Sequence, residues 1–355
     1  ALLGADDQKF RWLWAARHDV ESSQGGNPTA TVRRGDRSPS PYAISFPAPK
    51  RRRTERESAT NPMNSAPPGV TVVVPVFNAF EVLEDCLASL EVCCPDAEMV
   101  LVDDASSDPR VAPALAAFVA GREGRRLLTL PENRGFVHAA NRGMETAAGH
   151  PVLLNSDTIV TRGWLEALAR CLASDPSIAT ATPWSNNAEI VSVPRFCERN
   201  PVPDDPQAWA DAALASATGQ YPDLPTAVGF CMAVRAEALQ SLGGFDEAVF
   251  GRGYGEENDF CRRAADAGWR NVLCEDAYVV HVGGQSFGPL GLKPDEGSMA
   301  RLLERHPDYL EVVSAWIQSD PLADRRAALV AAHEQAPSVV KASGTLASSL
   351  EEPEQ

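Results

Sequence analysis

The stretch VTVVVPVFN, residues Val70–Asn78, decides the fold of this chain. Its run of β-branched residues is typical of a strand buried on both faces of a parallel sheet. Residues 81–92 follow with apolar side chains at helical spacing, which predicts a helix that packs beside that strand. A strand that leads into a helix of this kind is the first half of a β-α-β unit.

The same alternation of apolar runs and helical spacing continues along the chain. We predict further strands at 99–102, 127–130, 151–154, 178–182 and 277–280, and further helices at 111–120, 136–148, 164–172 and 207–217. Repeated β-α units of this length imply right-handed crossovers between parallel strands. The sequence therefore predicts an α/β fold with a mostly parallel central sheet and helices on both faces.

Composition excludes several classes of protein. The 355 residues include 48 Asp and Glu against 32 Lys and Arg, which gives a formal net charge of −16. We expect no nucleic-acid partner, because phosphate backbones are held by clustered Lys and Arg. The longest apolar stretch, at 70–77, is much shorter than the roughly 20 residues of a membrane span. The eight cysteines form no C-x-x-C pair, which indicates reduced thiols in a cytoplasmic protein.

Composition also divides the chain into four zones. Residues 1–66 are rich in Ser, Pro, Gly and Arg, and we interpret them as a mostly disordered leader or linker, or as the end of a preceding domain. Residues 67–290 form the predicted α/β domain. Residues 291–335 have helical spacing at 299–305 and 309–318 and are interpreted as a C-terminal helical cap. Residues 336–355 are a polar, flexible tail.

Polar residues follow two of the predicted strands, where an open α/β sheet binds its ligands. Asp103 and Asp104 end the second strand, and Asn155-Ser156-Asp157 follows the fourth. Such residues can cap the next helix or contact a ligand, and adjacent like charges favour the second interpretation. No G-x-G-x-x-G and no P-loop motif follows the first strand, which argues against a dinucleotide dehydrogenase and a P-loop enzyme.

Two residues could hold a hard divalent cation. Asp157 offers carboxylate oxygens, and a diphosphate ligand would supply others. His281 ends a predicted strand ahead of Gly283-Gly284, where a ligand can approach. The alternative for this histidine is a purely structural role.

A glycine-rich loop at 251–255 precedes a helix that opens with Glu256-Glu257. Acidic residues in a first turn are favoured by the helix dipole, and Asp259 with Arg263 has the spacing of an i,i+4 ion pair. These structural roles leave one glutamate available as a general base for an incoming hydroxyl. Trp184, Phe230 and Tyr254 are candidates for stacking on a ligand or, at least as well, for ordinary core packing.

Taken in order, these motifs resemble those of the bacterial family 2 glycosyltransferases with the GT-A nucleotide-diphospho-sugar transferase fold. The resemblance covers about residues 69–290. The motifs look most like those of the branch that makes rhamnose-containing and similar cell-surface polysaccharides. The matching pieces are Val72–Asn78, Val102–Asp108, Asn133-Arg134-Gly135, Asn141-Arg142-Gly143, Leu153–Asp157, Pro183–Asn187, Gly229–Val234, Gly244-Phe245-Asp246, Gly255–Phe260 and His281 with Gly284–Phe287.

The resemblance implies roles for individual residues. Asn155-Ser156-Asp157 looks like the family's D-x-D motif, with Asp157 and His281 as ligands of Mn²⁺ or Mg²⁺ and a departure at Asn155. Glu256-Glu257 occupies the place of the family's Glu-Asp pair, so Glu257 is the implied base and Glu256 its possible substitute. The implied nucleotide-sugar-binding residues are Pro75, Phe77, Asn78, Asp103, Asp104, Asn133, Gly135, Asn141, Asn155, Ser156, Trp184 and Gly229.

The implied activity is an inverting, metal-dependent transfer of a hexosyl or deoxyhexosyl group. The donor would be a UDP-, dTDP- or GDP-sugar, and the acceptor a hydroxyl of a glycan or lipid-linked molecule in cell-surface polysaccharide synthesis. We expect a cytoplasmic protein, or one peripheral on the cytoplasmic face of the inner membrane or within a multidomain synthase. The alternative is a catalytically silent nucleotide-sugar or glycan-binding domain of a larger synthase, which the departure at Asn155 keeps open. A sugar nucleotidyltransferase would need a basic glycine-rich loop after the first strand, and Val76–Ala79 is not one.

Overall fold

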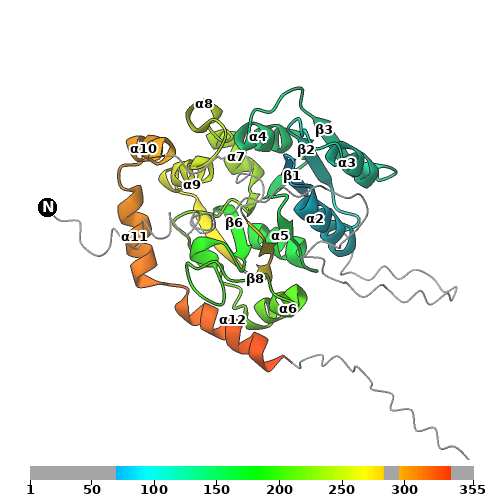
Figure 1. Ribbon diagram of the computed structural model, residues 1–355. Helices are drawn as coiled ribbons and strands as arrows, with labels where there is room; N and C mark the ends of the chain where they lie inside the picture. The colour runs from blue at the N-terminus through cyan, green and yellow to red at the C-terminus, as the bar shows by residue number, and fades with distance from the viewer. Residues whose placement is uncertain (1–68, 284–295, 337–355) are drawn as a thin grey trace, which may run out of the picture.

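The computed structural model describes residues 69–283 and 296–336. The predicted leader at 1–66, the Gly284–Phe287 motif and nearly all of the tail at 336–355 lie outside these residues. Nine strands and twelve helical segments can be placed in the described part (Figure 1). The strands are β1 (Val70–Val76), β2 (Met99–Asp103), β3 (Arg125–Thr129), β4 (His150–Leu154), β5 (Thr158–Ile159), β6 (Ile178–Trp184), β7 (Cys231–Val234), β8 (Arg270–Tyr278) and β9 (Val280–His281).

The helices lie mostly where helical spacing predicts them. They are α2 (Phe80–Cys93), α3 (Val111–Val119), α4 (Phe136–Thr146), α5 (Trp164–Ser174), the 3₁₀ turn η1 (Glu189–Val191), α6 (Pro206–Ser216), α7 (Ala236–Leu242), α8 (Glu247–Phe250), α9 (Glu256–Asp266), α10 (Glu296–Arg305), α11 (Tyr309–Ser319) and α12 (Ala323–Gln335). Helix α12 is a third helix beyond the two predicted near the C-terminal end of the described chain.

The central sheet has seven strands in the order β3-β2-β1-β4-β7-β6-β8. Strands β1 to β4 pair in parallel, and β6 pairs in parallel with β8. Strand β7 is antiparallel to both of its neighbours, β4 and β6. The prediction of an α/β fold with a mostly parallel sheet is confirmed, and β7 is a reversed strand that the β-α pattern did not reveal.

The two faces of the sheet bury separate cores, because successive side chains of a strand point to opposite faces. In β1, Val72 and Val74 join a cluster with apolar residues of α2, α3, α5 and α6. Val73 points the other way and joins a cluster with residues of α4, α9, α10 and α11. Gly143 of α4 allows close packing on this second face, since a Cβ there would lie 2.2 Å from Cγ1 of Val73.

A small second sheet pairs β5 with β9 in antiparallel register. Its register places Thr158 opposite His281. The backbone N–H of Val282 also donates to the carbonyl of Asp157, at 2.9 Å. This sheet therefore brings the segment that follows β4 beside the segment that follows β8.

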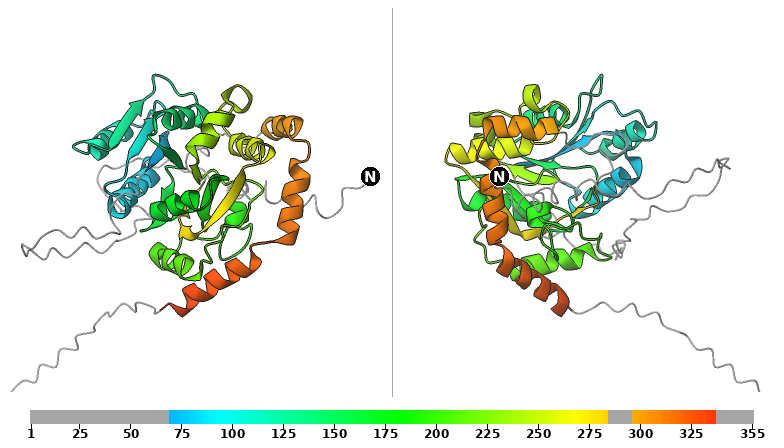
Figure 2. Two further views of the ribbon diagram at one scale, coloured as in Figure 1. Left: turned by 180° about the vertical axis from the view of Figure 1, so that it is seen from behind. Right: turned by 60° about the vertical axis from the view of Figure 1, so that its left-hand side comes forward.

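Helices α10, α11 and α12 follow one another along one edge of the α/β domain (Figure 2). Helix α12 packs against α6, where the rings of His333 and Trp209 stack with centroids 3.9 Å apart. Arg325 of α12 also donates to the buried carboxylate of Glu275 in β8, at 3.1 Å. The last helices are thus joined to the same sheet that carries the strand-end residues.

Candidate active site

Asp157 and His281 form the centre of the candidate site. The Nε2 atom of His281 lies 3.6 Å from Oδ1 of Asp157, and both side chains are largely buried. Asp157 follows β4 and immediately precedes β5, whereas His281 ends β9. Their proximity results from the β5–β9 pairing, which aligns Thr158 with His281.

The ring of His281 is held in one orientation by the loop that follows β6. Its Nδ1 lies 2.7 Å from the carbonyl oxygen of Asn187. Since a carbonyl can only accept, Nδ1 carries the proton, and in the neutral ring the lone pair of Nε2 faces Asp157. The side-chain amide of Asn186 also binds the backbone of His281. It accepts from the N–H of His281 at 2.9 Å and donates to the carbonyl of His281 at 3.2 Å.

Asn186 and Asn187 belong to the Pro183–Asn187 motif but are not among the site residues that the resemblance implies. Their place directly after a strand is the signal that could have identified them. Gly283 allows the loop to approach, since a Cβ at this position would lie 2.4 Å from Nδ2 of Asn187. The structure therefore adds an orienting layer around His281.

The residues that precede β7 connect this pair to the first turn of α9. The ring of Phe230 stacks on the ring of His281, with centroids 5.2 Å apart and an angle of 22° between the planes. The carbonyl of Phe230 accepts from the N–H of Asn155, at 2.8 Å. Next to it, a Cβ placed on Gly229 would lie 3.6 Å from the carboxyl carbon of Glu257. A series of contacts through Phe230 and Gly229 thus leads from the Asp157–His281 pair to Glu257.

Glu256 and Glu257 are both buried in the first turn of α9, with 5% and 7% of their surface exposed. Gly255, which precedes the helix, has a φ of 98°, a conformation that favours glycine. Free N–H groups and the helix dipole favour carboxylates at this end of a helix. Of the two, Glu257 is the glutamate whose carboxyl group lies nearest to where a Cβ on Gly229 would be, next to Phe230.

The carboxylate of Asp104 makes hydrogen bonds within the fold. It accepts from the backbone N–H groups of Arg134 and Gly135 and from the side-chain amide of Asn133, at 2.8–2.9 Å. Burial raises the pKa of Asp104, although the two backbone N–H groups act in the opposite direction. Arg252 in the glycine-rich loop donates in turn to Asn133. Asp104 therefore acts as a cap, but of the turn that leads into α4 rather than of the next helix in sequence.

Asn78 and Asp103 lie together at the carboxyl ends of β1 and β2, which pair with Val76 opposite Asp103. The side-chain oxygen of Asn78 accepts from the N–H groups of Ser107 and Asp108, at 2.8 and 2.9 Å. Oδ1 of Asp103 accepts from the N–H of Ser106, at 2.9 Å. These contacts shape the strand-end loops, and Pro75 and Phe77 belong to the same strand end.

Three further residues of the predicted binding set are buried or make hydrogen bonds within the fold. The amide of Asn141 makes two hydrogen bonds to the backbone of Phe245, at 2.8 and 2.9 Å. The side chain of Trp184 is buried in the core with 1% exposed, and Ser156 is buried as well. Among the aromatic candidates, Phe230 contacts His281, whereas Tyr254 is half-buried in the glycine-rich loop.

Within residues 69–283 and 296–336, no group of three or more His, Cys, Asp and Glu side chains is arranged to hold a metal ion by itself. The Asp157–His281 pair nevertheless fits a divalent cation that takes its other ligands from phosphate oxygens and water. The fixed tautomer of His281 suits this role, because a metal-binding imidazole needs its second nitrogen to be held by an acceptor.

Comparison with known proteins shows what the chain is similar to. Residues 71–243 match the family described as Glycosyl transferase family 2. An uncharacterised protein of Mycobacterium tuberculosis is 27% identical over 217 residues, which cover 60% of this chain and 73% of the relative. A second uncharacterised protein of that species is 34% identical over 121 residues, or 34% of this chain and 37% of the relative.

One solved structure shares the fold, and a second is similar at a lower score. The chain superimposes on the crystal structure of GalNAc-T7 with UDP, GalNAc and Mn²⁺ with a TM-score of 0.52 and 15% identity, covering 75% of this chain and 54% of that enzyme. A mannosyltransferase of Pyrobaculum calidifontis with GDP-Man and Mn²⁺ gives a TM-score of 0.47 and 21% identity, with 79% and 80% covered. The chain thus spans about half the length of GalNAc-T7.

The stretch 71–243, just under half of the chain, matches glycosyltransferase family 2, and the described residues have the GT-A fold. Both findings agree with the resemblance to the family 2 glycosyltransferases. The predicted α9 glutamates and His281 lie beyond the matched residues 71–243. None of the described helices has the length and apolar character needed to cross a membrane.

Proposed function

We propose that this domain is an inverting, metal-dependent glycosyltransferase that acts on a nucleotide-diphospho-sugar donor. The observation that carries the proposal is the Asp157–His281 pair, in which Oδ1 and Nε2 lie 3.6 Å apart. Phe230, which stacks on His281, and the adjacent Gly229 link this pair to the buried Glu257. A cation-binding pair next to a carboxylate base provides what a single displacement at an anomeric carbon requires. The fold shared with an enzyme whose structure holds UDP and Mn²⁺ supports the same conclusion.

Asp157 and His281 would hold Mn²⁺ or Mg²⁺ together with oxygens of the donor diphosphate. When bound, the cation neutralises the charge that develops on the diphosphate as it leaves. The protein supplies only two of the proposed metal ligands, and the carboxylate of Asp157 is the only one of the two with a formal negative charge. We therefore expect metal and nucleotide to bind together and to increase each other's affinity.

Glu257 would act as the general base. Its carboxylate accepts the proton of the acceptor hydroxyl while the acceptor oxygen forms a bond to the anomeric carbon. The bond from that carbon to the diphosphate oxygen breaks in the same step, so the configuration inverts and a nucleoside diphosphate leaves. Glu256 is the substitute base if Glu257 proves dispensable.

The strand ends of β1 and β2 would bind the nucleoside. Pro75, Phe77, Asn78 and Asp103 lie at this edge, and Asp104 shapes it through its hydrogen bonds to the turn before α4. The glycine-rich loop at 251–255 would close over the donor and exclude water. We also propose that the acceptor is a hydroxyl of a glycan or lipid-linked molecule in cell-surface polysaccharide synthesis. The proposed location is the cytoplasm or the cytoplasmic face of the membrane.

The proposal is tested by calorimetric titration of the full chain with UDP, dTDP and GDP, with and without MnCl₂ or MgCl₂. We expect at least one nucleotide to bind about tenfold more tightly with the metal. A panel of the corresponding nucleotide-sugars then reports slow donor hydrolysis, which requires no known acceptor. Metal-dependent binding without hydrolysis or transfer of any donor would instead favour a catalytically silent binding domain.

A further inference from the structure

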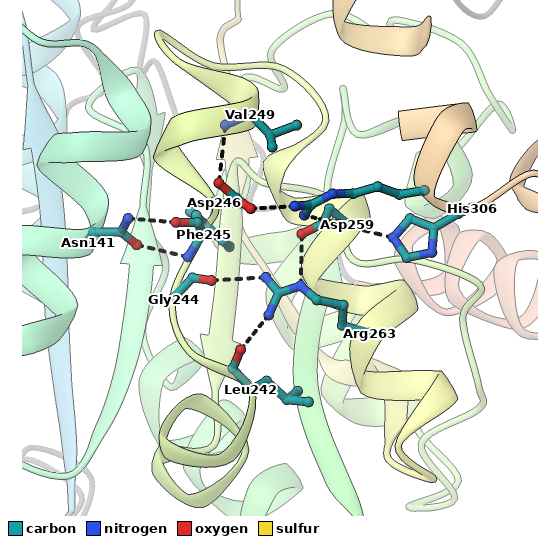
Figure 3. Close-up of polar contacts among 10 residues, drawn as sticks. Asn141, Leu242, Gly244, Phe245, Asp246, Val249, Asp259, Arg263 and His306 are labelled. Atoms are coloured by element: carbon teal, nitrogen blue, oxygen red, sulfur yellow. Dashed lines mark hydrogen bonds and ion pairs between the residues drawn. The ribbon is translucent and has the colours of Figure 1, made fainter. Parts of the chain in front are cut away.

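The buried carboxylate of Asp259 has more partners than its sequence neighbourhood explains. It is fully buried in the first turn of α9, two residues after Glu257. Its Oδ2 accepts from Nε of Arg263 at 2.8 Å, which is the expected i,i+4 pair. Its Oδ1 faces Nε2 of His306 at 3.0 Å and accepts from Arg305 at 3.2 Å. Figure 3 shows Arg263 and His306 converging on Asp259 from different elements.

Arg305, the last residue of α10, also reaches a second carboxylate. Its other terminal nitrogen donates to Oδ2 of Asp246 at 2.6 Å. Oδ1 of Asp246 accepts from the N–H of Val249 at 3.1 Å and so caps α8. One guanidinium therefore joins the two ends of the segment 246–259, which contains the glycine-rich loop and both candidate base residues.

The remaining contacts hold residues 242–245, which lead into this segment. Arg263 donates to the carbonyls of Leu242 and Gly244, at 2.7 and 2.9 Å, and Asn141 of α4 holds Phe245 (Figure 3). A loop with three glycines has many accessible backbone conformations, and fixing its two ends reduces that freedom. Burial of Asp259 would raise its pKa, but hydrogen bonds from His306 and Arg263 outweigh this effect and the pKa is lowered.

We propose that Arg305 is a positioning residue of the transferase site, which sets the place of Glu257 by bridging Asp246 and Asp259. His306 supports the bridge from the same end of α10. The inference rests on the proposed function of Glu257, and it assigns part of the site to a helix outside the stretch 71–243 that matches the family. A planar, forked guanidinium can bond two carboxylates at once, which a lysine ammonium does less well.

Arg305→Met and Asp246→Asn test the bridge, because both remove it while leaving Glu257 and the metal pair intact. The asparagine can still accept from Val249 and so preserves the cap of α8. The matched control is Asp308→Asn, which removes another ion pair between α9 and the C-terminal helices, 2.8 Å from Arg262, without touching Asp246 or Asp259. Arg305→Lys shows how far a single ammonium restores the function.

For both bridge variants we expect the kcat of donor hydrolysis or transfer to fall by about tenfold or more, with the affinity for nucleotide and Mn²⁺ changed less than about twofold. Asp308→Asn should keep both values. Equal losses of kcat in all three variants would mean that α10 acts only through packing, and unchanged kcat in Arg305→Met would overturn the proposal.

Hydrogen–deuterium exchange provides a readout that needs no activity. In Arg305→Met, the amides of residues 247–258 should exchange faster than in the wild type, while the strands of the central sheet keep their protection. Unchanged exchange in this segment would overturn the bridge even if the chain proves inactive. A wild-type protein that binds no nucleotide would refute the proposed function separately from this result.

Discussion

The Nε2 atom of His281 lies 3.6 Å from Oδ1 of Asp157, although the two residues come from segments far apart in the sequence. The short β5–β9 pairing creates this contact, and the carbonyl of Asn187 fixes the imidazole. Under the proposed function these two residues would hold a divalent cation together with a diphosphate, and the two side chains should therefore respond to mutation in a metal-specific way.

Asp157→Ala should abolish the gain in nucleotide affinity that Mn²⁺ provides, while weak metal-independent binding persists. The reason is that the only carboxylate of the proposed pair is lost. Calorimetric titration of UDP, dTDP or GDP with and without MnCl₂ measures the effect. Glu145→Gln, an exposed carboxylate paired with Arg142, is the control and should keep the full metal effect. The same metal dependence in Asp157→Ala would remove Asp157 from the site.

Asn186→Ala should weaken metal-dependent nucleotide binding by about 10- to 100-fold, since loss of an orienting residue around a metal ligand has effects of this size. Asn186 is buried and makes hydrogen bonds to both backbone groups of His281. The variant leaves the imidazole itself in place. Titration with nucleotide and MnCl₂ checks the prediction, and a loss of stability without any loss of metal-dependent affinity would contradict it.

Glu257→Gln should retain donor binding and lose transfer, with kcat reduced by roughly 10²- to 10⁴-fold, the usual contribution of a general base. The amide keeps the size of the side chain and its place beside Gly229 but accepts no proton. Glu256→Gln is the matched comparison in the same turn. Steady-state kinetics with the donor identified by the panel provide the test. If Glu256→Gln shows the larger loss, the base is Glu256.

The sequence was sufficient for the features that depend on local pattern. The β-branched run at Val70–Val76 predicts β1, and the spacing of Asp259 and Arg263 predicts their ion pair, which the structure contains at 2.8 Å. Strand-end position also singled out Asp157 and His281 as separate candidates. Their roles as metal ligands remain predictions, but their proximity is observed.

The remaining features depend on contacts between distant segments. Strand β7 has only four residues, and its reversed direction is decided by the neighbours β4 and β6 between which it pairs. Arg305 and His306 lie some 46 and 47 residues after Asp259, and no local pattern connects them to it. The burial of Trp184, at the end of β6 with 1% of its surface exposed, also depends on such contacts, and its implied binding role stays a prediction.

Asp259 should make the stability of the fold sensitive to acid. Its pKa is lowered in the folded protein, so the ionised group stabilises the fold above its unfolded-state pKa, and this contribution is lost as the pH falls through the lowered value. Asp259→Asn should cost roughly 2–4 kcal/mol at pH 7, because Arg263, Arg305 and His306 lose their charged partner. The difference from wild type should shrink below about pH 4. Urea denaturation at pH 7, 5, 4 and 3 measures it, and a difference independent of pH would exclude this role for the charge.

Gly229→Ala should separate activity from stability. A Cβ there would lie 3.6 Å from the carboxyl group of Glu257, an ordinary contact, so the free energy of unfolding should change by less than about 1 kcal/mol. The methyl group nevertheless occupies the space beside the proposed base, and kcat should fall. Gly135→Ala is the contrasting variant: its φ is 97° and a Cβ would lie 2.6 Å from Cα of Arg252, so we expect a loss of about 1–3 kcal/mol. Thermal unfolding and donor hydrolysis, measured on both variants, check the pair. Full activity in Gly229→Ala would show that the reacting groups do not pass between Gly229 and Glu257.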